Sequence, residues 1–137
     1  MRKLLIVVLG VVAVIIVIGI LGMVVLGQDA GKVQFSATAY DQSNATCHMD
    51  NPITTASTNG SFYMIAALRD TLEGGQQFTL TVTKDGQSYG QPLTSSLPSK
   101  FNCYIEQNPM SLTDPGVYKF TFTLDGKIES EGTLIVK

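Results

Sequence analysis

The chain has 137 residues, enough for one domain and a short appendage, and its charges are distributed unevenly. Arg2 and Lys3 precede a run without charged or strongly polar side chains, and the other seven basic and all eleven acidic residues follow that run. The later part therefore carries a formal charge of −4, which argues against nucleic acid and anionic lipid as partners.

The apolar run covers residues 4–27, and its 24 residues would measure about 36 Å as a helix, against about 30 Å for the hydrocarbon core of a bilayer. This predicts a single transmembrane helix within residues 1–27. A cleaved secretory signal, with cleavage before Gln28, is the alternative, although its apolar region is usually only about 7 to 15 residues long. The basic start predicts a cytoplasmic N-terminus, with the rest of the chain extracellular or periplasmic.

Both cysteines, Cys47 and Cys103, lie in the part that is expected to be exported. No CxxC motif and no cysteine and histidine spacing typical of zinc sites competes with their pairing, and an oxidising compartment favours a disulfide. We therefore expect a Cys47–Cys103 disulfide. Two buried free thiols are the alternative.

After the anchor, residues 28–32 are expected to form a short polar tether, and residues 33–137 have the length of one β-sandwich domain. Residues 33–40 alternate apolar and polar side chains, which is typical of a half-buried strand. Residues 41–61 are polar and are expected to form a long loop or a poorly marked edge strand. Residues 62–68 contain no polar side chain except the Tyr63 hydroxyl, which indicates a strand covered on both faces or one with an exposed apolar docking face.

A turn is predicted at residues 69–76, followed by the clearest strand of the chain at residues 77–83, where Phe, Leu and Val alternate with Thr. Lys84-Asp85-Gly86-Gln87 predicts a hairpin turn. Residues 91–100 are expected to form a loop rich in Pro and Ser, and residues 101–106 a short strand.

A polar connection is expected at residues 107–114, and residues 118–124 then alternate as a strand. Asp125-Gly126 predicts a second hairpin turn, and residues 128–137 are expected to return as the last strand. Short strands with turn signals about every ten residues, without an amphipathic helix, predict an all-β fold, an antiparallel two-sheet sandwich.

The segment Asp114-Pro-Gly-Val-Tyr118 is similar to the tyrosine corner of immunoglobulin-like domains, with Asp114, Gly116 and Tyr118 at the matching positions. Together with FYMIAALRDTLEGGQQFTLTVTKDG and PGVYKFTFTLDGKIESEGTLIVK, it resembles the Ig-like and fibronectin-III-like modules of prokaryotic membrane-anchored surface proteins. The resemblance implies an Ig-like sandwich and a binding or structural role, and it fixes no chemistry. Phe120 stands where antibody-type domains have their second cysteine, and the chain has no Trp.

Cys47-His48-Met49 contains ligands that a copper site uses, but such sites need two histidines and His48 is the only one. We therefore expect no metal or cofactor, and we expect His48 to be an exposed loop residue. Asn44 and Asn59 begin Asn-x-Ser/Thr triplets and are possible glycosylation sites.

No catalytic motif is present, and the two acids Asp70 and Glu73 near a turn are expected to be solvated rather than catalytic. The sequence thus predicts a non-enzymatic single-pass membrane protein that presents an Ig-like interaction domain outside the membrane. The alternative is a small accessory subunit of a larger integral membrane complex, since a tether of five residues reaches at most about 18 Å. In both cases a protein partner is expected, and recognition through residues 41–61 could involve a protein or a glycan.

Overall fold

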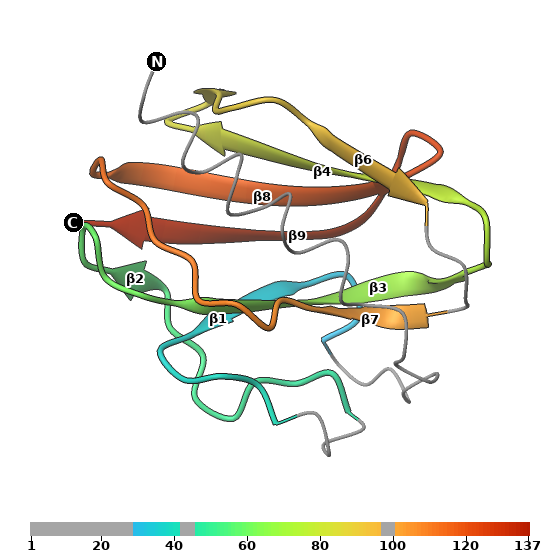
Figure 1. Ribbon diagram of the computed structural model, residues 1–137, viewed down its shortest axis with the longest axis horizontal. Coiled ribbons are helices and arrows are strands. Elements are labelled where there is room, and N and C mark those ends of the chain that lie inside the picture. Colours follow the sequence, from blue (N-terminus) through green and yellow to red (C-terminus); the bar gives the residue numbers. More distant parts are fainter. Residues whose placement is uncertain (1–28, 42–45, 97–100) are drawn as a thin grey trace.

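The computed structural model describes residues 29–41, 46–96 and 101–137, and the predicted anchor at residues 4–27 lies outside these ranges. The described residues form two β-sheets that pack face to face (Figure 1). Within these ranges no helix is long and apolar enough to cross a membrane. The all-β prediction is confirmed for the part of the chain that the structure describes.

The smaller sheet has three antiparallel strands in the order β1–β3–β7. They are β1 (Val33–Ser36), β3 (Tyr63–Leu72) and β7 (Phe101–Ile105). Strand β3 is central, with Ala66 opposite both Val33 and Tyr104. This sheet forms the lower layer in Figure 1.

The larger sheet has the order β2–β9–β8–β4–β5, and β6 also pairs with β4. Its strands are β2 (Thr55–Ala56), β4 (Gln77–Lys84), β5 (Gln87–Ser88), β6 (Leu93–Ser96), β8 (Gly116–Leu124) and β9 (Lys127–Val136). All pairs are antiparallel except the short β2, which runs parallel to β9. This two-sheet arrangement is compatible with the broad Ig-like superfold.

Two segments differ from the sequence-based prediction, and a third adopts one of its two alternatives. Strand β3 continues to Leu72, through the first half of the predicted turn, because a register shift after Ala67 lets the polar residues stay exposed while Leu72 pairs with Phe101. Strand β6 lies in the predicted Pro/Ser loop, whereas the short β2 fits the edge-strand alternative for residues 41–61. Both lie at the border of the larger sheet, where pairing to a stronger neighbour determines the strand.

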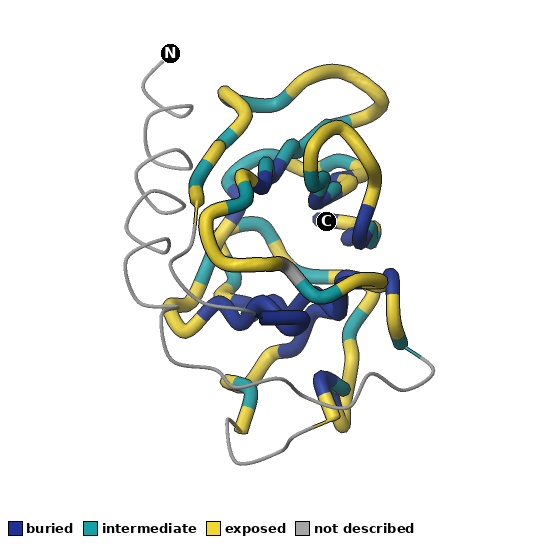
Figure 2. Tube along the Cα trace, turned by 90° about the vertical axis from the view of Figure 1, so that its right-hand side faces the viewer, coloured by how far each residue is buried: buried dark blue, intermediate teal, exposed yellow. Residues whose placement is uncertain are grey.

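The main core lies between the two sheets, and Figure 2 shows buried residues concentrated in this layer. Aromatic side chains from both sheets meet there: the ring centroids of Phe35 and Phe120 are 5.1 Å apart, and those of Tyr104 and Phe122 are 4.9 Å apart. Such tilted aromatic pairs contribute both apolar burial and favourable ring geometry. The alternation of residues 77–83 and 118–124 places Phe78, Leu80, Phe120 and Phe122 in this core.

A second apolar cluster covers the outer face of the three-stranded sheet. It consists of Cys47, Met49, Ile65, Ala67, Cys103 and Ile105. Met64, Ala66 and Leu68 of the same strand point instead into the main core. The prediction that β3 is covered on both faces is therefore confirmed, and the alternative of an exposed apolar docking face on this strand is wrong.

Candidate functional site

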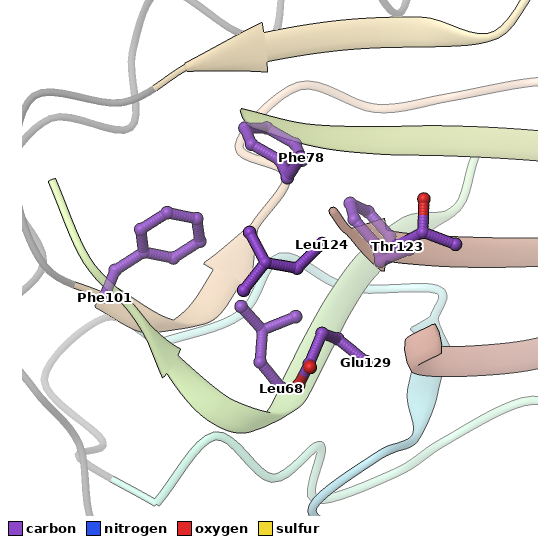
Figure 3. A pocket seen from close by; sticks show the side chains of 7 residues that line it. Leu68, Phe78, Phe101, Thr123, Leu124 and Glu129 are labelled. Atoms are coloured by element: carbon purple, nitrogen blue, oxygen red, sulfur yellow. The ribbon is translucent and has the colours of Figure 1, made fainter. Parts of the chain in front are cut away.

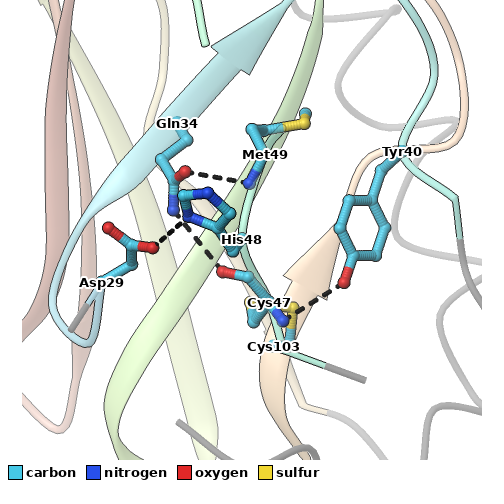
Figure 4. Close-up of a disulfide and its surroundings, with 7 residues drawn as sticks. All are labelled: Asp29, Gln34, Tyr40, Cys47, His48, Met49 and Cys103. Atoms are coloured by element: carbon cyan, nitrogen blue, oxygen red, sulfur yellow. Dashed lines mark hydrogen bonds and ion pairs between the residues drawn. A yellow bond between two sulfur atoms is a disulfide. The ribbon is translucent and has the colours of Figure 1, made fainter. Parts of the chain in front are cut away.

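Residues 46–51, which follow β1 in the chain, lie over the outer face of the three-stranded sheet and are fixed there by a disulfide. We call them the covering segment. Cys47 pairs with Cys103 of β7, with 5.8 Å between their Cα atoms, as predicted (Figure 4). Both cysteines are fully buried in the second apolar cluster. The bond therefore links the covering segment to the sheet that it covers.

A buried amide holds the same segment from β1. The Gln34 side chain accepts a hydrogen bond from the backbone N–H of Met49 at 3.0 Å and donates to the carbonyl of Cys47 at 3.5 Å (Figure 4). Gln34 thus satisfies two backbone groups in a segment that has no strand partner there. Polarity at a buried strand position was the only available signal for this role, and it was not recognised from the sequence.

Tyr40 and Asp29 fix the two borders of the segment. The Tyr40 hydroxyl accepts the backbone N–H of Cys47 at 3.2 Å, and burial raises the pKa of this tyrosine. The carboxylate of Asp29 contacts Nδ1 of His48 (Figure 4). The Lys32 Nζ lies 3.6 Å from Oδ1 of Asp29. His48, expected to be an exposed loop residue, is thus partly exposed and held by a carboxylate.

Between the end of β1 and this covering segment lies an open polar pocket of about 400 Å³, including the space at its mouth. Ser36 and Met49 are buried at its base, and the rest of the lining is exposed or half-buried. The lining residues are Ser36, Thr38, Ala39, Tyr40, Asp41, His48, Met49, Asp50 and Asn51. We refer to this site as the loop pocket.

The Cys47 sulfur is bound in the disulfide, so it cannot serve as the thiolate ligand that a blue-copper site requires. Across residues 29–41, 46–96 and 101–137, no three His, Cys, Asp or Glu side chains are grouped so that they could hold a metal ion. What the loop pocket offers is hydrogen bonding by hydroxyl, amide, imidazole and carboxylate groups.

A second, smaller hollow lies at one end of the sandwich (Figure 3). Its walls are core side chains, among them Leu68, Phe78 and Phe101, and Glu129 borders it. Glu129 is 2% exposed, accepts the backbone N–H of Asp70 at 2.9 Å and lies 3.7 Å from the Lys127 ammonium. These partners indicate that Glu129 stabilises the fold at this end of the core.

Asp70 forms an ion pair with Lys127 at 2.8 Å, and this hydrogen bond and charge lower the pKa of the Asp70 carboxyl. Both side chains are largely exposed, so the pair contributes little to stability. Glu73 lies exposed in the turn before β4. A carboxyl with a lowered pKa is a poor general acid, so this position does not suit Asp70 to that role.

Glu106, directly after β7, is a buried carboxyl without a basic partner among the contacts that the structure describes. The backbone N–H of Asn108 donates to it at 2.8 Å and the Tyr104 hydroxyl lies at 3.5 Å. Glu106 is only 1% exposed, and burial raises its pKa to about 7 from 4.5. No pattern in the sequence indicated this buried carboxyl, because a Glu at the end of a strand is usually solvated.

Titration of Glu106 is expected to make the domain less stable as the pH rises. The folded carboxyl binds its proton more tightly than the unfolded one, so its contribution is complete below about pH 4.5 and is lost as the pH approaches 7. In that window the free energy of unfolding should fall by up to about 1.4 kcal/mol for each pH unit. Glu106→Gln should flatten this slope in urea titrations at several pH values. Equal slopes in both proteins would contradict the assignment.

The Tyr118 hydroxyl donates to the backbone carbonyl of Asp114 at 2.8 Å, four residues upstream. This is the bond that a tyrosine corner makes. Tyr118 is fully buried at the start of β8, its ring packs edge-on against Tyr89 at 5.1 Å, and burial raises its pKa. Gly116 begins the strand next to Lys84 and Asp85.

Replacing Tyr118 with Phe is expected to lower the free energy of unfolding by about 1 kcal/mol, the contribution of one hydrogen bond. The ring stays in the core, so the apolar contacts are retained and only the hydroxyl is lost. Urea unfolding of the two proteins measures the difference. If the variant is as stable as the parent, the hydroxyl does not stabilise the corner.

Of the two predicted glycosylation sites, Asn59 lies exposed in a turn with a φ of 61°, and its backbone N–H donates to the carbonyl of Leu112. Its side chain is thus accessible for modification. Asn44 lies outside the described residues. Glycosylation at either position stays a prediction.

No family model matches the chain, and no curated protein and no solved structure matches it.

Proposed function

We propose that the chain is a non-enzymatic single-pass membrane protein whose extracytoplasmic Ig-like domain is a binding module. The observation that supports this most directly is the loop pocket, an open polar site on a segment held in place by Gln34 and the Cys47–Cys103 disulfide. A binding site on a loop needs such a rigid support, since ordering a mobile loop on binding costs free energy. The disulfide also fits an oxidising compartment.

The proposed localisation is the cell membrane, with the N-terminus in the cytoplasm and the domain extracellular or periplasmic. It rests on the apolar run at residues 4–27 and on Arg2 and Lys3 before it. The Ig-like modules of prokaryotic membrane-anchored surface proteins, which the sequence resembles, have the same organisation. We propose this class as the origin of the chain.

Membrane fractionation tests this proposal. A chain tagged after Lys137 should stay in the membrane pellet at alkaline pH, and protease added to intact cells or spheroplasts should remove the tag. Mass spectrometry of the N-terminus then separates a retained anchor from a signal cleaved before Gln28. A tag that is protected from protease, or a soluble uncleaved chain, would contradict the proposal.

The alternative is an accessory subunit of a larger membrane complex, and the contacts of residues 29–32 favour it. The Gly31 N–H donates to the carbonyl of Ala67 at 2.7 Å, the Ala67 N–H donates to that of Lys32 at 3.0 Å, and Asp29 contacts His48. The described part of the expected tether is thus fixed to the sandwich. If residues 4–27 span the membrane, little free chain remains between anchor and domain, and the domain would lie close to the bilayer.

A native gel of gently solubilised membranes distinguishes the two functions. Co-migration with other integral membrane proteins at fixed stoichiometry would identify an accessory subunit. Migration alone would favour the binding module.

A further inference from the structure

We propose that the loop pocket binds a neutral sugar unit of a glycan. This inference rests on the proposed binding function and names its ligand class. The first argument is the hydrogen-bonding character of the lining. Ser36, Thr38 and Asn51 can both donate and accept, and the carboxylates of Asp41 and Asp50 accept only. A sugar presents several neighbouring hydroxyls that each donate and accept, so it can use both kinds of group.

The second argument is charge. The described lining contains no Lys or Arg and includes Asp41 and Asp50, so an anionic ligand such as a phosphate or a uronic acid would be repelled. The Lys32 ammonium lies 3.6 Å from Asp29, whose carboxylate contacts His48 on the pocket wall. The two carboxylates would also attract a cation, so the charge disfavours only an anionic ligand. The hydroxyl and amide groups of Ser36, Thr38 and Asn51 are what favours a sugar over a simple cation.

The third argument is the fixed shape of the site. One wall follows β1, where Ser36 Oγ accepts the backbone N–H of Thr38 at 3.1 Å. The opposite wall, residues 48–51, is held to β1 by Gln34 and to β7 by the neighbouring disulfide (Figure 4). A pocket whose walls are fixed before binding loses less free energy on ordering when the ligand enters.

Amide chemical shifts of the ¹⁵N-labelled full chain in detergent micelles test the proposal. The probes are the methyl glycosides of glucose, galactose, mannose and N-acetylglucosamine, and the matched acidic probes are glucuronic and galacturonic acid. At least one neutral probe should shift the amides of residues 48–51, and its acidic counterpart should bind more weakly. Asp50→Asn should weaken binding about tenfold, the effect of one charge-assisted hydrogen bond. Thr121→Ala, on the opposite sheet, should leave the affinity unchanged.

The same sugar presented as a glycolipid headgroup in nanodiscs distinguishes two sources of the ligand. Equal binding in both forms indicates a free or wall-bound glycan, and stronger binding in the nanodisc indicates a glycolipid. The proposal is wrong if no neutral probe shifts residues 48–51, if the acids or free lysine bind as tightly as the sugars, or if Asp50→Asn has no effect. The fractionation and protease experiment on the proposed function does not depend on the ligand. A membrane-anchored, protease-accessible domain that binds no sugar would therefore overturn the ligand class alone, so the two failures can be told apart.

Discussion

Replacing Gly132 with Ala is expected to lower the free energy of unfolding by about 4 kcal/mol, a large effect for one methyl group. Gly132 lies in the middle of β9, where this strand passes β1 of the other sheet. A Cβ atom at this position would lie 2.2 Å from the carbonyl oxygen of Val33 and 2.8 Å from its Cβ. The clash is with backbone, so no side-chain rotation can relieve it.

The two strands are also linked next to this contact. The Glu131 N–H donates to the carbonyl of Gly31 at 3.1 Å, and the backbones of Lys32 and Glu131 form an isolated parallel β-bridge. Moving β1 away from Gly132 would therefore break hydrogen bonds that join the two sheets. Gly132 is not among the glycines with positive φ, so the expected loss comes from the close approach and not from backbone strain.

Urea unfolding of the full chain in detergent micelles, followed by tyrosine fluorescence, measures this effect. All five tyrosines lie after residue 33, so the signal reports on the domain and not on the predicted anchor. Gly126→Ala is the matched control: Gly126 has a φ of 83° and nothing within 4 Å of an added Cβ, so only about 1 kcal/mol of backbone strain is expected. Equal losses in both variants would show that the sheets separate without cost at Gly132.

Gly132 also illustrates what could be predicted from the sequence and what could not. Strong alternation predicted β4 and β8, where Phe78, Leu80, Phe120 and Phe122 are buried against the opposite sheet, and the Asp125-Gly126 turn signal predicted the returning strand β9. A glycine inside a strand pattern indicates a bulge or a close backbone approach, so Gly132 carried a signal. Its contact with Val33 could not be inferred, because it depends on how the two sheets pack.

The loop pocket was predictable only in part for the same reason. The polar segment 41–61 was identified as a possible recognition loop, and Cys47 and Cys103 were paired correctly. Ser36 and Asn51, however, face one pocket only because Gln34 and the disulfide fold the segment back over β1. No local pattern in the sequence encodes that return. Cys47, His48 and Met49, which were considered as copper ligands, instead form the disulfide, contact Asp29 and pack in the second apolar cluster, respectively.

Removing the Cys47–Cys103 disulfide is expected to cost about 4 kcal/mol, because the bond joins residues 56 apart in the sequence and restricts the unfolded chain. Cys47→Ser should therefore destabilise the domain as much as the double variant Cys47→Ser/Cys103→Ser, since either change removes the same bond. A reductant should destabilise the parent by a similar amount and leave both variants unaffected. If Cys47→Ser is as stable as the parent, the bond does not stabilise the domain.

The location of the bond leads to a second, more specific expectation. Cys47 attaches the covering segment to the outer face of the three-stranded sheet, whereas the main core between the sheets does not include either cysteine. Without the bond, the described contacts that hold this segment are the hydrogen bonds of Gln34 and Tyr40, the contact between Asp29 and His48, and apolar packing. Below the unfolding transition, Cys47→Ser should therefore accelerate hydrogen exchange, relative to the parent, more at residues 46–51 than at β4 and β8. Uniform acceleration across both sheets would instead show that the covering segment and the sandwich unfold as one unit.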